Sequence, residues 1–84
     1  MTGDDLRRMR ERYRLSQAEL GRYLRKSPKT IMRREALGNR PLPIEEAIAW
    51  AVIEMLFLKP KLLRELEAQA AWDREVFARL PKES

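Results

Sequence analysis

Seven cationic side chains occupy residues 22–40, a stretch that contains a single acid, Glu35. They are Arg22, Arg25, Lys26, Lys29, Arg33, Arg34 and Arg40. Guanidinium and ammonium groups gathered in this way bind phosphate oxygens, and nucleic acid is the usual polyanionic partner of such a patch. Residues 1–40 carry 12 Lys or Arg against 5 Asp or Glu, whereas residues 41–84 carry 6 against 8, so the net charge of +5 belongs to the first half. The charge alone is equally compatible with a solvated surface.

The sequence offers little for catalysis or metal binding. It contains no Cys and no His, which excludes disulfides, thiol nucleophiles, zinc fingers and the usual general base. The adjacent carboxylates Asp4–Asp5 and Glu45–Glu46 point in different directions on a helix and do not converge, so we interpret them as charges near helix starts. We therefore expect no enzymatic activity, no metal and no cofactor.

No segment of the sequence predicts membrane insertion or export. The longest apolar region, residues 44–58, is interrupted by three Glu and is 15 residues long, whereas a membrane span needs roughly 20 apolar residues. The first residues show no positively charged stretch leading into an apolar run. We expect a cytoplasmic protein that makes no membrane contact.

The basic stretch is predicted to lie on helices, and nothing in the sequence predicts a strand. The fold class is therefore all-α, a compact bundle of about five helices. Capping boxes, in which a Thr or Ser is followed three residues later by an acid, predict helices over residues 4–13 and 17–24. Ser27 followed by Pro28 starts a third helix over 28–37, and the Gly- and Pro-containing residues 38–43 form a linker.

A fourth helix, over residues 44–58, is apolar on two sides and must be covered on both. One face consists of Ile44, Ala47, Ile48, Ala51, Val52 and Met55, and the other of Trp50, Ile53 and Phe57. We expect the first face to close the core and the second to contact the last helix or another subunit. That last helix is predicted to start at Pro60 and to reach about residue 80. Asp73 falls near the centre of its apolar arc, which leaves open a break at 72–73.

Two short helices with a tight connection, the second rich in cations, form the arrangement that places a helix in the major groove of DNA. Gly21 supplies the small residue that is needed where the two helices cross. The positions that fit are Leu15, Ser16, Gln17, Leu20, Leu24, Ser27, Thr30, Ile31, Arg33 and Glu35. In type and spacing they closely resemble the helix-turn-helix of the Cro and lambda-repressor-like (XRE-type) family. The resemblance covers roughly residues 5–58, and it departs from the family pattern at Arg25, where the turn usually has Gly.

The resemblance implies a set of DNA-contacting residues. Base readout is assigned to the outward face of the helix that starts at residue 28, namely Pro28, Lys29, Met32 and Arg33. Arg33 is the best single candidate, because guanidinium can present two parallel donors to guanine. The resemblance also assigns a phosphate contact to Gln17. The location of other residues beside this helix adds further expected phosphate contacts, namely Arg22, Arg25, Lys26, Ser27, Thr30, Arg34 and Arg40. The resemblance also implies a structural ion pair between Arg10 and Glu35.

We interpret the chain as a sequence-specific DNA-binding transcriptional regulator, a small homodimeric repressor that occupies a near-palindromic operator in a prokaryotic or phage-infected cell. Residues 1–58 form its helix-turn-helix DNA-binding domain, and residues 59–84 form a C-terminal helical extension for dimerisation. The expected dimer interface consists of Trp50, Ile53, Phe57, Leu62, Leu66, Trp72, Val76 and Phe77. The alternative is a protein-interaction module, antitoxin-like or phage inhibitor-like, whose C-terminal helices bind a different protein.

Overall fold

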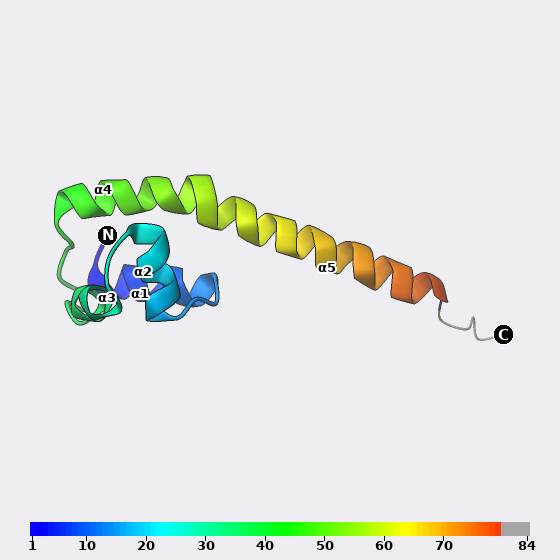
Figure 1. Ribbon diagram of the computed structural model, residues 1–84, viewed down its shortest axis with the longest axis horizontal. Helices are drawn as coiled ribbons and strands as arrows, with labels where there is room; N and C mark the ends of the chain where they lie inside the picture. The colour runs from blue at the N-terminus through cyan, green and yellow to red at the C-terminus, as the bar shows by residue number, and fades with distance from the viewer. Residues whose placement is uncertain (80–84) are drawn as a thin grey trace.

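The computed structural model of the chain describes residues 1–79, without the side chain of Phe77 (Figure 1). Its elements are α1 (Gly3–Arg12), α2 (Gln17–Leu24), α3 (Pro28–Glu35), α4 (Ile44–Ile53), the π-helical η1 (Glu54–Leu58) and α5 (Lys59–Arg79). The described part contains no strand, only an isolated bridge between Thr2 and Pro41. The all-helical class is thus confirmed, and the third helix ends two residues earlier than predicted.

The α4, η1 and α5 segments run as one continuous helix, so residues 1–79 form four helices rather than five. Pro60 was expected to start a new helix, because proline lacks the N–H of the α-helical ladder. Instead the ladder changes register just before it: the Lys59 N–H donates to the Glu54 carbonyl oxygen five residues back, and this π turn absorbs the proline. The domain boundary expected at residue 58 falls inside this helix.

The bundle is compact only over its first half. Most of α5 extends beyond α1–α3, and the molecule measures 60 × 21 × 19 Å (Figure 1). No break occurs at residues 72–73, where α5 continues to Arg79. The Asp73 carboxylate is exposed and accepts a hydrogen bond of 3.0 Å from the Gln69 side-chain amide, so it carries no burial cost that would favour a break.

The helix starts are fixed by the caps that the sequence predicted. Thr2 and Asp5 form a complete capping box on α1, as do Ser16 and Glu19 on α2. The Ser27 hydroxyl accepts the Thr30 N–H at the start of α3. The backbone N–H of Thr2 lowers the pKa of Asp5, and that of Ser16 lowers the pKa of Glu19, because each hydrogen bond favours the carboxylate.

The core lies between α1, α2, α3 and one face of α4. It consists of Leu6, Met9, Tyr13, Leu15, Leu20, Leu24, Ile31, Leu42, Trp50 and Leu58. The face of α4 that enters it is the reverse of the one expected: Trp50 is only 2% exposed, whereas Ile44 and Ile48 are 74% and 62% exposed. Trp50 is therefore a core residue of its own chain and no part of a dimer interface.

Two glutamates explain this orientation of α4. Glu46 and Glu54 lie four residues before and after Trp50, hence on the same face of the helix. Glu46 accepts two hydrogen bonds from Arg34 of α3, and Glu54 accepts one from the Tyr13 hydroxyl at 2.7 Å. Burial and the bond to Glu54 together raise the pKa of Tyr13. Turning the other apolar face inward would break both attachments.

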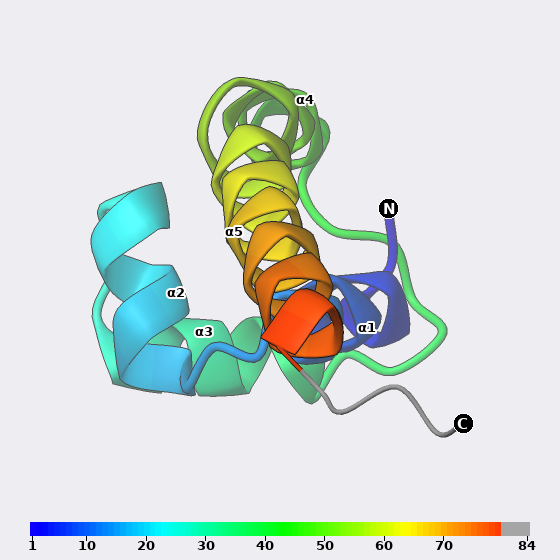
Figure 2. The same cartoon turned by 90° about the vertical axis from the view of Figure 1, so that its right-hand side faces the viewer.

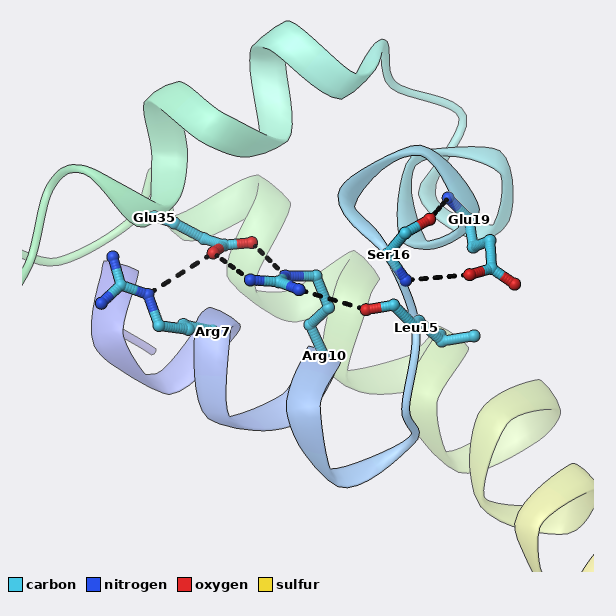
Figure 3. Close-up of polar contacts among 6 residues, drawn as sticks. All are labelled: Arg7, Arg10, Leu15, Ser16, Glu19 and Glu35. Atoms are coloured by element: carbon cyan, nitrogen blue, oxygen red, sulfur yellow. Dashed lines mark hydrogen bonds and ion pairs between the residues drawn. The ribbon is translucent and has the colours of Figure 1, made fainter.

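A buried ion pair joins α1 to the end of α3, and it is the pair implied by the resemblance (Figure 3). Glu35 is 2% exposed and accepts hydrogen bonds from Arg10 Nε at 2.7 Å and from Arg10 Nη2 at 3.0 Å. Arg10 Nη1 donates to the Leu15 carbonyl oxygen at 3.1 Å, which holds the connection between α1 and α2. Arg7, on the exposed side, lies 3.5 Å from Glu35.

Replacing Glu35 by Ala should unfold most of the domain. The change leaves the Arg10 guanidinium partly buried without its carboxylate, which costs about 3–5 kcal/mol, a large share of the roughly 5–15 kcal/mol that stabilises a natural domain. Thermal melting followed by circular dichroism measures the loss. Arg7→Ala is the control, because its half-exposed guanidinium is worth less than about 1 kcal/mol. An unchanged melting temperature for Glu35→Ala would contradict the structural role of the pair.

The free energy of unfolding should fall as the pH is lowered through the acidic range. Asp5 and Glu19 have folded-state pKa values below their ordinary 3.8 and 4.5, so their stabilisation is complete above those ordinary values and is lost as the pH falls through the folded ones. Urea unfolding at a series of pH values measures this slope. The double variant Asp5→Asn, Glu19→Gln should show a shallower fall than the wild type, and equal slopes would rule out the capping carboxylates as its source.

Candidate nucleic-acid interface

The α3 helix presents one face to the core and the opposite face to solvent. Ile31, fully buried, anchors the inner face, and Gly21 of α2 lets the two helices approach closely. A Cβ atom at Gly21 would overlap the Lys26 carbonyl oxygen in the turn between them. The residues predicted to read bases lie together on the outer face, all exposed, namely Pro28, Lys29, Met32 and Arg33.

The cations on this outer face have no ion-pair partner in the part of the chain that the structure describes. Among the described residues, neither Lys29 nor Arg33 has an acidic side chain within ion-pair distance. Both therefore remain available to an anion that approaches from solvent. The planar guanidinium of Arg33 provides paired donors for a guanine edge or a phosphate, and the ammonium of Lys29 provides a point charge.

The turn before α3 keeps a left-handed residue even though that residue is an arginine. Arg25 has φ 57° and ψ 43°, a conformation that glycine adopts without steric cost. The N–H groups of Arg25 and Lys26 both donate to the Gly21 carbonyl oxygen, which closes the end of α2. The turn thus has the geometry that a glycine would give, and the strain is carried by Arg25.

Arg34 and Lys26, two of the cations predicted to contact phosphate, both lie within ion-pair distance of one acid of α4. Arg34 donates to the Glu46 carboxylate from Nε at 2.6 Å and from Nη2 at 3.2 Å, and the bond to Glu46 raises the pKa of Arg34. The Lys26 ammonium lies 3.8 Å from the same carboxylate. Both cations are therefore engaged in fastening α3 and its preceding turn to α4. The sequence contained one signal for this pairing. Glu46 lies four residues before Trp50, so the two side chains share one face of the helix.

The uncharged members of the predicted phosphate set lie at helix starts. Gln17 is the first residue of α2 and is partly exposed. The Ser27 and Thr30 hydroxyl oxygens lie 3.0 Å apart and are hydrogen-bonded to each other.

Arg40, a charged member of the predicted phosphate set, is exposed in the linker, where its Nε donates to the Leu37 carbonyl oxygen at 3.3 Å.

Arg22 and Arg25 line a cleft between α2 and η1, a location that the sequence did not predict. The cleft has a volume of about 450 Å³, and its other lining residues are Tyr23, Leu24, Ile53 and Phe57. Among residues 1–79 neither arginine forms an ion pair. The cleft therefore combines apolar and aromatic walls with two arginines that form no ion pair in the described part of the chain.

The residues predicted for the dimer interface are divided by the structure into three groups. Trp50 is buried, and Ile53 and Leu62 are partly buried against the core of their own chain. The exposed members are Phe57, Leu66 and Trp72, while Val76 is half-buried and the side chain of Phe77 lies outside the described residues. The sequence did not predict that Ile44, Ile48, Val52 and Met55 of α4 and η1 are exposed, because this face was expected to close the core.

Replacing Arg25 by Gly should stabilise the domain. The left-handed conformation costs a residue with a side chain about 1–2 kcal/mol, part of which is offset by the greater chain entropy of unfolded glycine, so we expect a net gain of about 0.5–1 kcal/mol and a melting temperature several degrees higher. Arg25→Ala is the matched control, because it removes the guanidinium but keeps a Cβ. Equal melting temperatures for the two variants would contradict backbone strain at this position.

Comparison with known proteins identifies no relative: no family model, no curated protein and no solved structure matches the chain. Over residues 1–79 the structure contains no cluster of acidic side chains arranged to hold a metal ion. No described helix is both long and apolar enough to cross a membrane. Within the described residues, the exposed face of α3, supported by α2, carries two cations without an ion-pair partner, Lys29 and Arg33.

Proposed function

We propose that the protein is a sequence-specific DNA-binding regulator that acts as a homodimer, with α3 of each subunit in the major groove of a near-palindromic operator. The observation that carries the proposal is the outer face of α3, where Lys29 and Arg33 are exposed and unpaired within the described chain. A short helix that projects cations from a neighbour crossing beneath it fits the width of the groove. Occupancy of a promoter by such a dimer represses transcription by excluding polymerase.

The ion pairs of Glu35 and Glu46 support this proposal through the rigidity that they give α3. Arg10 holds the last residue of α3, and Arg34, near the same end, is held by α4. A reading helix must be held in a fixed orientation, because a hydrogen bond to a base edge depends on distances of about 3 Å and near-linear angles. Bonds from two different helices supply that constraint.

A protein-interaction module remains a second candidate function, and one observation favours it. Large apolar side chains of α4, η1 and α5 are exposed, including Met55 at 68% and Trp72 at 60%. Exposed apolar surface of this extent marks an interaction site. Under this alternative the partner is a different protein, and substitutions in α3 leave its binding unchanged.

Selection of bound sequences from a random duplex library at about 150 mM salt tests the DNA-binding function, because non-specific affinity is already weak there. We expect enrichment of an inverted repeat with half-sites about one helical turn apart. Arg33→Ala should relax the preference at one position of each half-site, with a loss of about 1–3 kcal/mol in affinity. Arg64→Ala, an exposed arginine on α5, is the control and should not alter the site. Absence of any enriched sequence for the wild type would refute the proposal.

A further inference from the structure

The outward face of α4 carries an apolar stripe that nothing in the described chain covers. Ile44, Ile48, Val52 and Met55 follow one another at intervals of four, four and three residues, which places them on one side of the helix. Their exposed fractions are 74%, 62%, 47% and 68%. In both ribbon views α1, α2 and α3 lie on one side of α4 (Figure 1 and Figure 2).

The two ends of this stripe carry opposite charge. Glu45 is exposed beside Ile44 and forms no ion pair within residues 1–79. At the other end, Phe57 is 57% exposed in the cleft that Arg22 and Arg25 line. Residues 45 and 57 are separated by about 18 Å along the helix, and within residues 1–79 Glu45 forms no ion pair with either arginine.

A second copy in antiparallel orientation brings these complementary ends together. A two-fold axis perpendicular to α4 near Ala51 places the Ile44 end of one helix beside the Phe57 end of the other. Each Glu45 then approaches the arginines of the partner's cleft, and Ile48 packs across the axis. A parallel arrangement would instead place Glu45 beside Glu45 and arginine beside arginine.

The exposed apolar surface is large enough for a stable dimer. The four residues of the stripe are followed by Leu56 and Phe57, which are 63% and 57% exposed. Together these six side chains present on the order of 700 Å² to solvent, close to the ~800 Å² that each partner contributes to an interface of standard size. On the described part of α5 the large exposed apolar side chains are Leu63, Leu66 and Trp72, and Leu63 and Trp72, nine residues apart, point in opposite directions.

We propose that the protein dimerises through an antiparallel pairing of α4–η1, in which the Ile44–Met55 stripes pack together and Glu45 of each subunit binds Arg22 and Arg25 of the other. The inference names the surface that makes the dimer, and so it rests on the homodimer of the proposed function. In this dimer the cleft between α2 and η1 lies inside the interface and is occupied by Glu45 and Ile44 of the second copy.

Sedimentation velocity without DNA tests the apolar part of the interface, at protein concentrations of about 1–100 µM, where interfaces of this size assemble. We expect a dimer for the wild type and a monomer for Ile48→Glu, whose fold is retained because the side chain is already exposed. A circular dichroism melt checks that fold. Trp72→Glu is the matched control on α5 and should remain dimeric. A wild-type monomer, or a dimer that Trp72→Glu breaks and Ile48→Glu does not, overturns the proposal.

A charge exchange tests the orientation. Glu45→Arg should raise the dimer dissociation constant at least tenfold, and adding Arg22→Glu should restore most of the loss, because the antiparallel pairing brings these two positions together across the axis. A double variant no tighter than the single one overturns the antiparallel pairing. These readouts contain no DNA, so their failure is separate from failure of the proposed function, which a dimer that enriches no sequence would show.

Discussion

The position of α3 depends on one buried carboxylate. Glu35 ends the helix, and Arg10 closes on it with two hydrogen bonds while a third reaches the Leu15 carbonyl oxygen. A charge at this depth is tolerated only when it is fully paired, so the pair fixes α1, α3 and the connection that leads into α2 as one unit. Gly3 extends the same contact, since α1 begins directly against the backbone of residues 34–38 and has no room there for a side chain.

The attachment of α4 follows the same rule in a weaker form. Its two pairing glutamates, Glu46 and Glu54, are partly exposed, and each meets a cation from the first half of the chain. They set the rotation of the helix about its own axis, because the apolar side chains on its two faces do not distinguish inside from outside. The consequence is that Trp50 fills the core while four aliphatic or sulfur-containing side chains are left in solvent. The ion pairs of Glu46 and Glu54 therefore determine which apolar face of the helix is exposed to a partner.

Local signals in the sequence predicted the local structure well. The capping boxes, the Ser27–Pro28 start and the Gly-Pro linker each act within a few residues, so α1, α2 and α3 begin within one residue of their predicted positions. The outer face of α3 was predictable for the same reason, since it is fixed by one anchor, Ile31, and by helical periodicity. The inward face of α4 was predicted wrongly, because it depends on distant residues. For the same reason the sequence did not predict the pairing of Arg34 with Glu46 or the cleft that Arg22 and Arg25 line. The sequence also did not predict the π turn before Pro60. A proline is typical of a helix start, and the register shift that accommodates it inside a helix has no signal in the sequence.

Only some of the cations in residues 1–40 are without an ion-pair partner in the described chain. Of its 12 basic residues, six lie within ion-pair distance of an acid in the described chain, namely Arg7, Arg8, Arg10, Arg12, Lys26 and Arg34. Of these six, Arg10 and Arg34 make the hydrogen-bonded ion pairs that join α3 to α1 and to α4. Lys29 and Arg33 on α3, by contrast, form no ion pair within residues 1–79, and neither do Arg22 and Arg25 in the cleft. Because these two pairs lie on different surfaces, the DNA contact proposed for α3 and the partner carboxylate proposed for the cleft do not compete for the same cations.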